Sequence, residues 1–169
     1  MKPRPIKIDG EVAYITLTKG HVAVIDAADV PLVDGWNWHS IDYKKSMTVY
    51  ASRTVWIGGG RFRIFMHREI LDAPTNMQVD HIDGDGLNNM RENLRLATSS
   101  QNCHNHRISL RNTSGFKGVS RHKKSDKWRA YIRFQGRQIW LGLFDTPEEA
   151  AAAYAAASEK FHGEFGRLE

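Results

Sequence analysis

One strong helix near the C-terminus, preceded by three short strands, constrains the fold most. Thr146-Pro147-Glu148-Glu149 combines an N-cap residue, a proline at the first helical position and a glutamate three residues after the threonine. The run Ala150–Ala157 has high helix propensity, and Gly163 is predicted to end the helix. The strands are predicted at Phe116–Arg121, Trp128–Phe134 and Gln138–Leu143. Because alanine side chains are small, we expect this helix to lie close on a three-stranded sheet.

Alternation along these strands predicts one apolar and one polar face. The apolar face of the middle strand is formed by Trp128, Ala130 and Ile132, and the other face by Arg129, Tyr131 and Arg133. In the third strand Gln138 and Trp140 lie opposite Ile139 and Leu141. Arginine, glutamine and aromatic side chains on one face are the mix expected for phosphate and base contacts. The alternative is a basic face that is simply exposed to solvent.

Charge is distributed unevenly along the chain. Residues 113–142 contain eight Lys or Arg and one acid, Asp126, for a net charge of +7, whereas residues 143–169 have a net charge of −4. A basic block of this kind favours a polyanionic partner and adds Arg121, Lys127 and Arg129 as candidate contacts. A solvated charged loop is the alternative.

The first 66 residues are predicted to be β-rich. Short β-branched runs separated by Asp9-Gly10 and Lys19-Gly20 predict strands at Ile6–Ile8, Ala13–Leu17 and His21–Ile25. A short helix is predicted within Asp29–Trp38, and a hairpin is predicted from Thr48–Ile57 and Arg61–Met66. On this hairpin period-two alternation would place Arg53, Arg61 and Arg63 on one face. That face would contact phosphates, or it would be an ordinary solvent face.

Residues 67–112 are predicted to form strand, loop, strand and helix. The strands are Met77–Ile82 and Leu94–Ala97, and Thr98 or Ser99 would cap a helix that runs to about Arg107. Asp83-Gly84-Asp85-Gly86 is predicted to form turns, with both aspartates as turn formers. Asp80 and His81 are adjacent, so their side chains should point to opposite faces unless the strand is distorted.

The spacing of Asp80, His81, Asn93 and Asn102 predicts a phosphodiesterase site. A histidine with a near-neutral pKa can act as general base on water. A divalent ion on oxygen ligands can stabilise the transition state and the leaving oxygen. Asn102, on the predicted helix, could bring its amide oxygen to the ion that Asp80 binds. The alternative for an isolated Asp-His pair is a surface turn.

These residues resemble the HNH endonucleases, particularly the phage and intron-associated homing type. The resemblance covers residues 67–107 and is carried by His67-Arg68, Val79–Asp83, Asn88-Asn89, Glu92–Arg95 and Ser100–Asn102. It implies a ββα-metal fold with Asp80 and Asn102 as metal ligands and His81 as general base. Asn93 would hold the loop and orient the histidine. The implied cofactor is one Mg²⁺ ion, or Mn²⁺ in its place.

Residues 114–169 are similar to the AP2 DNA-binding domain. The similarity is carried by Ser114–Val119, Trp128–Ile132, Ile139–Gly142, Phe144–Thr146 and Glu149–Tyr154. It implies a three-stranded antiparallel sheet that lies in the DNA major groove. The positions that the resemblance marks as DNA contacts are Lys117, Ser120, His122, Tyr131, Arg133, Gln138, Trp140 and Tyr154. Several of them differ from the plant transcription factors, so the plant target sequence does not carry over.

The sequence therefore predicts an α+β protein with a β-rich region at 1–66, an HNH nuclease at 67–112 and an AP2 domain at 113–169. We expect a metal-dependent endonuclease that binds double-stranded DNA and, as a monomer, nicks one strand in a homing process. Alternatives are a DNA-binding regulator with a decayed nuclease site and a weakly specific defence or packaging nuclease. The single cysteine, Cys103, and the lack of a membrane or signal segment favour the cytoplasm of a prokaryotic or phage-infected cell.

Overall fold

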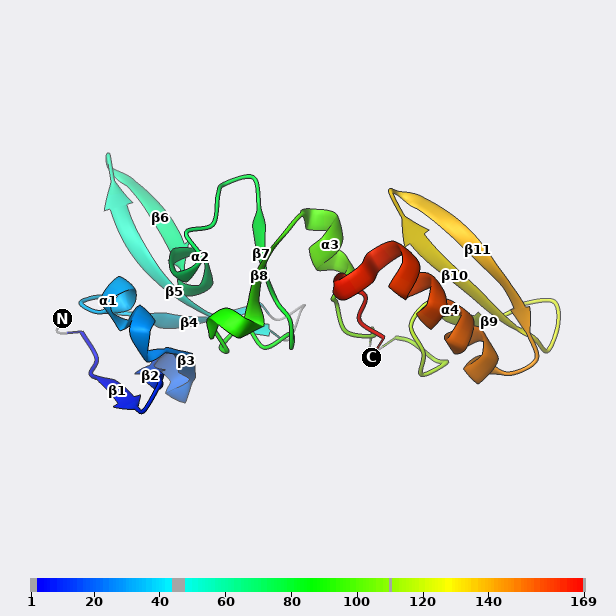
Figure 1. Cartoon of the computed structure of the whole chain (residues 1–169). Helices are drawn as coiled ribbons and strands as arrows, with labels where there is room; N and C mark the ends of the chain where they lie inside the picture. The colour runs from blue at the N-terminus through cyan, green and yellow to red at the C-terminus, as the bar shows by residue number, and fades with distance from the viewer. Residues whose placement is uncertain (1–2, 44–47, 110, 169) are drawn as a thin grey trace. The chain divides into compact units, whose positions relative to one another are not determined.

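The fold is described from a computed structural model that covers residues 3–43, 48–109 and 111–168. The chain divides into two compact units, Met1–Thr98 and Ser99–Glu169. Figure 1 shows that the first unit contains several small sheets, whereas the second contains one sheet and the long helix α4. The predicted α+β class is confirmed.

Most of the strands and helices are short. The strands are β1 (Ile6–Asp9), β2 (Val12–Thr16), β3 (Val22–Asp26), β4 (His39–Tyr43), β5 (Thr48–Ile57), β6 (Gly60–Phe65), β7 (Gln78–His81), β8 (Leu94–Ala97), β9 (Val119–Arg121), β10 (Trp128–Phe134) and β11 (Arg137–Phe144). The α-helices are α1 (Val30–Val33), α2 (Met66–Ile70), α3 (Ser99–His104) and α4 (Pro147–His162). Short 3-10 helices are η1 (Thr18–Gly20), η2 (Ala27–Asp29), η3 (Arg91–Asn93) and η4 (Gly163–Phe165).

Antiparallel pairs build all of the described sheets of the first unit. Their strand orders are β1-β2-β3, β4-β5-β6 and β7-β8. The predicted strands of residues 6–25 and the predicted hairpin are confirmed to within a few residues, whereas β4 was not predicted. The predicted helix within Asp29–Trp38 is confirmed only as the short segment α1, which begins with Pro31 in its first turn.

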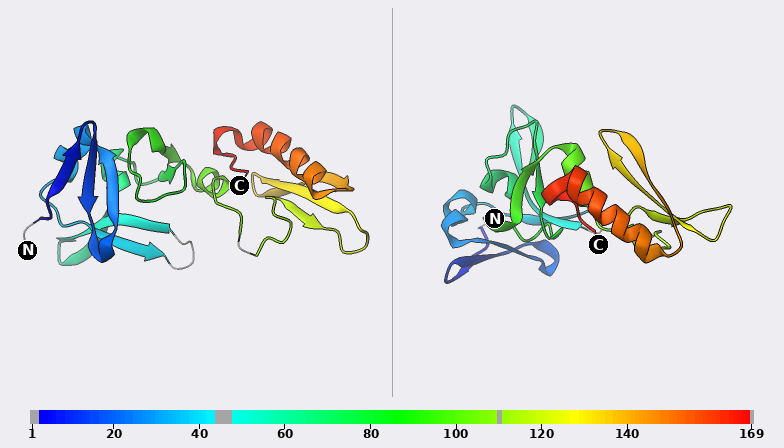
Figure 2. Two further views of the ribbon diagram at one scale, coloured as in Figure 1. Left: turned by 90° about the horizontal axis from the view of Figure 1, so that it is seen from below. Right: turned by 45° about the vertical axis from the view of Figure 1, so that its right-hand side comes forward.

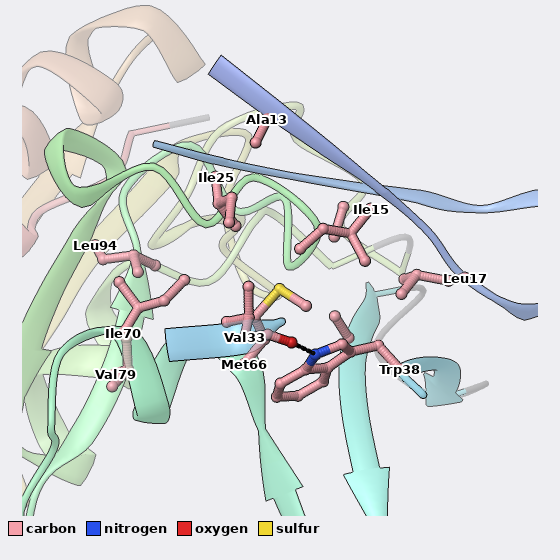
Figure 3. Close-up of a cluster of buried hydrophobic side chains, with 12 residues drawn as sticks. Ala13, Ile15, Leu17, Ile25, Val33, Trp38, Met66, Ile70, Val79 and Leu94 are labelled. Atoms are coloured by element: carbon pink, nitrogen blue, oxygen red, sulfur yellow. Dashed lines mark hydrogen bonds between the residues drawn. The ribbon is translucent and has the colours of Figure 1, made fainter. Parts of the chain in front are cut away.

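One hydrophobic core joins the N-terminal strands to the two motif strands β7 and β8. The indole of Trp38 is 2% exposed and donates a 2.8 Å hydrogen bond from Nε1 to the Val33 carbonyl (Figure 3). The remaining members come from β2, β3, β5, α2, β7 and β8 and from Leu17: Ala13, Ile15, Leu17, Ala23, Ile25, Ala51, Met66, Ile70, Val79 and Leu94. Strands β2, β3 and β5 therefore brace the strands that carry Asp80 and His81.

The β5-β6 hairpin corrects one prediction. The register pairs Thr54 with Arg63 and Trp56 with Arg61, whereas Arg53 pairs with Ile64. Arg53 therefore lies on the opposite face from the other two arginines. Its side chain is buried, forms a bidentate ion pair with Glu69 and lies 3.9 Å above the Trp36 ring. Arg53 is thus a structural residue of the first unit.

The second unit packs one sheet, with strand order β11-β10-β9, against α4. Figure 2 shows α4 running along one side of this sheet. The predicted capping box is confirmed, because Thr146 Oγ1 accepts from the Glu149 amide and the Glu149 carboxylate accepts from the Thr146 amide. Gly163 follows the last turn, as predicted. The apolar side chains Ala130, Ile132, Ala150, Tyr154 and Ala157 fill the space between sheet and helix.

Two element ends differ from the prediction. The first strand of this sheet begins at Val119 rather than Phe116, because Asn112 and Ser114 hold residues 112–118 in turns by side-chain hydrogen bonds. Helix α3 ends at His104 rather than near Arg107, and it clusters with the second unit.

None of the helices in the described part of the chain has the length and apolar character that crossing a bilayer requires.

Candidate functional site

His81 is the last residue of β7 and lies in a buried cluster of rings. Its ring centroid is 5.0 Å from that of His67 and 5.7 Å from that of Tyr50, and the residue is 5% exposed. Burial lowers the pKa of His81, although the Asn89 amide and the nearby carboxylates of Asp83 and Asp80 oppose this change. The imidazole is therefore neutral at neutral pH, which is the form that a general base requires.

The ring of His67 packs edge-on against the ring of His81. It stacks on Phe65 with ring centroids 5.3 Å apart, and Tyr50 meets it edge-on at 5.5 Å. Burial, His81 and Arg68 lower the pKa of His67 to about 3. Its buried Nδ1 has no hydrogen-bond partner among the described residues. Sequence reasoning noted His67 within the motif but did not assign it a role.

Asp80 points away from His81. The β7-β8 register runs from Gln78↔Ala97 to His81↔Leu94 without a shift, so the distortion considered for this strand does not occur. Adjacent side chains in a regular strand lie on opposite faces. Asp80 pairs across the ladder with Arg95, whose Nε lies 2.8 Å from Asp80 Oδ2; the Asp80 side chain is buried and that of Arg95 is partly buried. No sequence pattern indicated this ion pair.

Asn93 holds the loop after β7 in place by side-chain hydrogen bonds to Asp83 and Asn88. Its Oδ1 accepts from the Asp83 amide at 3.0 Å, and its Nδ2 donates to Asp83 Oδ1 at 3.0 Å and to the Asn88 carbonyl at 2.8 Å. Burial alone would raise the pKa of Asp83, but hydrogen bonds from Asp85, Asn88 and Asn93 lower it. Asp83 and Asp85 accept these bonds as turn formers, which agrees with the prediction for both.

The N-terminal sheet holds the other side of this loop. Val24 in β3 donates its amide to the Leu87 carbonyl and accepts from the Asn89 amide, at 2.9 and 2.7 Å. Arg91 donates from Nε and Nη2 to the carboxylate of Asp29 at 2.8–3.0 Å. Asn89, which is fully buried, places its Oδ1 3.5 Å from Nε2 of His81. The Asn88-Asn89 pair belonged to the resemblance, but its contact with the histidine came only from the structure.

The predicted metal ligands carry oxygen donors, the type of donor that a hard cation prefers. Asp80 would supply an anionic oxygen and Asn102 an amide oxygen, donors that suit Mg²⁺ or Mn²⁺. Asn102 lies on α3 in the second unit, whereas Asp80 lies in the first, so their joint coordination stays a prediction. Within residues 3–43, 48–109 and 111–168, no three His, Cys, Asp or Glu side chains gather as an ion site. An ion at Asp80 would share that carboxylate with Arg95.

The β10-β11 sheet face that points away from α4 matches the predicted alternation. Tyr131 pairs with Trp140 and Arg133 with Gln138, so these four side chains share a face. Trp140 is 57% exposed, and Arg133 and Gln138 are also exposed. Arg129 belongs to the same face and donates from Nε to Ser120 Oγ at 2.8 Å. Together, Arg129, Tyr131, Arg133, Gln138 and Trp140 make up what we call the sheet face.

Three other predicted DNA contacts are placed differently. The Lys117 ammonium donates to three backbone carbonyls, and burial together with Arg167 lowers its pKa to about 8. Arg121 is exposed and pairs with Asp126 at 2.6 Å. Tyr154, a residue of α4, is only 7% exposed and packs against Gly118. Lys117 and Tyr154 are therefore not part of the sheet face.

Comparison with known proteins divides the chain at the same motifs. A family model described as HNH endonuclease matches residues 72–104, and one described as AP2 domain matches residues 114–164. The uncharacterized HNH endonuclease L560 of Acanthamoeba polyphaga mimivirus is 30% identical over 161 residues, which cover 91% of this chain and 79% of that protein. Protein 3.8 of Escherichia phage T7 is 38% identical over 95 residues, which cover 56% of this chain and 78% of that protein.

The C-terminal residues also have plant relatives. The ethylene-responsive transcription factor ERN3 of Medicago truncatula is 40% identical over 67 residues, which cover 38% of this chain and 28% of that protein. No solved structure matches the chain significantly.

Proposed function

Since this chain belongs to the HNH endonuclease family and carries an AP2 domain, we propose that it is a metal-dependent endonuclease that nicks double-stranded DNA. One observation carries this proposal most strongly. The buried, neutral His81 lies beside a loop that Asn93 and β3 hold in place, on a chain that also presents a cationic and aromatic sheet face.

His81 is proposed to remove the proton from the attacking water. We assign His81 the tautomer with its N–H at Nε2, because the Asn89 Oδ1 that lies 3.5 Å from this atom can only accept. The lone pair of the neutral ring is then at Nδ1, which would accept the water proton. Asn89 and Asn93 act as positioning residues, the first on the ring and the second on the loop. Mutation of a residue in such a positioned set typically costs orders of magnitude in rate.

Asp80 and Asn102 are proposed to hold the cofactor, Mg²⁺ or Mn²⁺. When bound, such an ion stabilises negative charge on the phosphate and on the leaving oxygen. The attacking water oxygen forms a bond to phosphorus while the phosphorus–O3′ bond breaks. The products would be a 5′-phosphate and a 3′-hydroxyl.

The sheet face is proposed as the main DNA-binding surface. Arg129 and Arg133 offer charge for phosphates, Gln138 offers an amide for a base edge, and Tyr131 and Trp140 offer apolar contacts. The major groove of B-form DNA admits a two-stranded ribbon such as β10-β11. Arg121 and Lys127 are proposed as peripheral phosphate contacts, although Arg121 would have to leave Asp126, and Lys127 would have to leave Asp145.

The β5-β6 hairpin is proposed as a second DNA contact. Residues 48–65 contain no acidic residue, and Arg61 and Arg63 are exposed on one face. Next to its glycine turn, Trp56 is 71% exposed, Ile57 65% and Phe62 53%. Exposed apolar side chains of this size mark interaction sites, and arginines beside them favour DNA.

A monomer is proposed, because a single nuclease motif per chain accounts for the cutting of one strand. The viral relatives support action in the cytoplasm of a prokaryotic or phage-infected cell, and a homing role is the corresponding biological proposal.

Cleavage of supercoiled plasmid tests the nuclease. We expect wild type with Mg²⁺ to convert plasmid that carries candidate target DNA into open circles, and chelator or His81→Ala to stop this. Cleavage by His81→Ala at the wild-type rate would contradict the proposed base. DNA binding without cleavage on any selected target would favour a regulator with a decayed nuclease site. Cleavage at many unrelated sites would favour a weakly specific defence or packaging nuclease.

A further inference from the structure

The side chain of Lys117 joins three segments that are far apart in the sequence. Its Nζ donates to the carbonyls of His104 at 2.6 Å, His106 at 2.7 Å and Arg167 at 3.0 Å. An ammonium group has three N–H donors, so these contacts use all of them. His104 is the last residue of α3, and its carbonyl has no partner within the helix. A lysine at this end of a helix also complements the helix dipole.

The backbone around Lys117 is fixed to the body of the AP2 domain. Gly118 has a φ of +71°, and a Cβ at this position would lie 2.1 Å from the Tyr154 ring. The preceding turn is closed by Ser114, whose Oγ lies within hydrogen-bond distance of the carbonyls of Phe116 and Val119, at 3.0 and 2.9 Å, and accepts from the Phe116 amide at 3.2 Å. Lys117 therefore extends from a rigid part of the domain, so its three hydrogen bonds hold α3 and the C-terminal segment in place.

A second contact fastens α3 to the same domain. The ring of His104 stacks on that of His162 in α4, with centroids 3.6 Å apart and planes inclined by 13°. His162 is itself positioned, because its Nε2 donates to the Arg133 carbonyl at 2.9 Å and its Nδ1 lies 3.4 Å from Ser158 Oγ. Helix α3 is thus held at its end by a hydrogen-bonded ammonium and a stacked ring.

We infer that Lys117 is a positioning residue that fixes α3, and with it Asn102, to the DNA-binding domain. The inference rests on the proposed function, since Asn102 has a role only if the chain is a nuclease. It assigns the helix of the nuclease motif to the domain that binds DNA, in agreement with the division of the chain at Thr98 and Ser99. Binding of the sheet face to DNA would then also place Asn102, without a flexible joint between them.

The single cysteine, Cys103, allows the proposed role of Lys117 in fixing α3 to be tested directly in the full chain. Cys103 is exposed on α3, next to Asn102, so a nitroxide attached to it reports the motion of this helix. In wild type we expect a restricted nitroxide spectrum. Lys117→Met removes the three donors and keeps the aliphatic stem, so we expect a severalfold faster label motion. Lys160→Met, an exposed lysine on α4, is the matched control and should leave the spectrum unchanged.

DNA binding by the same variants separates this role from a phosphate contact. A lysine that fixes α3 does not neutralise a phosphate, so Lys117→Met should keep the wild-type Kd within about twofold and the same dependence on salt. A decrease of about 0.9 in the slope of log K against log salt would instead identify a phosphate contact and overturn the inference. An unchanged nitroxide spectrum in Lys117→Met would overturn it equally. Neither readout depends on cleavage, so failure of the proposed nuclease would be seen separately.

A third variant covers the case in which Lys117→Met does not fold, as judged by circular dichroism. Lys117→Arg keeps the charge, but a planar guanidinium cannot direct three donors as a tetrahedral ammonium does. We expect intermediate label motion in this variant, and wild-type motion would contradict the inference. If the protein proves to be an active nuclease, Lys117→Met should also lower the rate of cleavage at saturating DNA.

Discussion

The imidazole rings of His67 and His81 lie 5.0 Å apart and almost perpendicular, at 88°. His67 is the first residue after Met66 in α2, and His81 ends β7, so two separate elements bring these rings together. Tyr50 contacts both rings from β5. The proposed general base, His81, therefore packs against the rings of His67 and Tyr50, and the three residues come from three different elements of the first unit.

This arrangement predicts that acid destabilises the first unit through His67. Its folded pKa of about 3 lies below the ordinary value of 6.5, so below pH 6.5 the unfolded chain binds a proton that the folded chain does not. The free energy of unfolding should fall as the pH drops from 6.5 towards 3, by up to about 1.4 kcal/mol per pH unit. His67→Phe should show a shallower dependence. Urea unfolding followed by Trp fluorescence at several pH values measures both, and equal slopes would contradict the prediction.

Removing Asp80 should affect folding as well as cleavage. Asp80→Ala should abolish cleavage and leave DNA binding largely intact, but it also leaves the partly buried Arg95 guanidinium without the Asp80 carboxylate. The expected loss of stability is about 3 kcal/mol. The double variant Asp80→Ala/Arg95→Met should recover most of this stability and remain inactive. Plasmid cleavage and urea unfolding test the two parts, and full activity of either variant would remove Asp80 from the site.

The sheet face should determine the salt dependence of DNA binding. Arg133→Ala combined with Trp140→Ala should weaken binding and lower the salt slope by about 0.9, since one phosphate contact is lost with Arg133. Arg137→Ala is the control, because Arg137 pairs with Phe134 and so lies on the other face of the sheet. Fluorescence anisotropy at several salt concentrations measures the slope. An equal effect of both changes would show that a different surface binds DNA.

The proposed DNA contact of the β5-β6 hairpin should have two separable parts, the charge of its arginines and the apolar contact of Trp56. Arg61→Gln with Arg63→Gln should lower the salt slope by up to about 1.8, whereas Trp56→Ala should weaken binding without changing the slope. Ile8→Ala, an exposed apolar residue of β1, is the control for general loss of apolar surface. A footprint that does not shorten in these variants would limit DNA contact to the AP2 domain.

Local sequence patterns predicted much of this protein because they act over a few residues. The capping box at Thr146 and Glu149 depends only on neighbouring backbone groups, and alternation along β10 and β11 places Arg133 with Gln138. Arg53 shows where such reasoning fails. To predict which side chains of two strands share a face, the register between the strands must be known. The Gly58–Gly60 turn sets a register in which Arg53 lies on the face with Glu69 and Trp36.

By itself, the sequence determined the order of the elements, the two motifs and the residues with the chemistry for a nuclease and a DNA-binding sheet. Only the tertiary structure decided which partners these residues meet. It placed His67 and Asn89 on His81, Arg95 on Asp80, and the Lys117 ammonium on the carbonyls at the end of α3. The physical reason is that buried polar groups must find partners, and these partners lie on elements that only chain packing brings together.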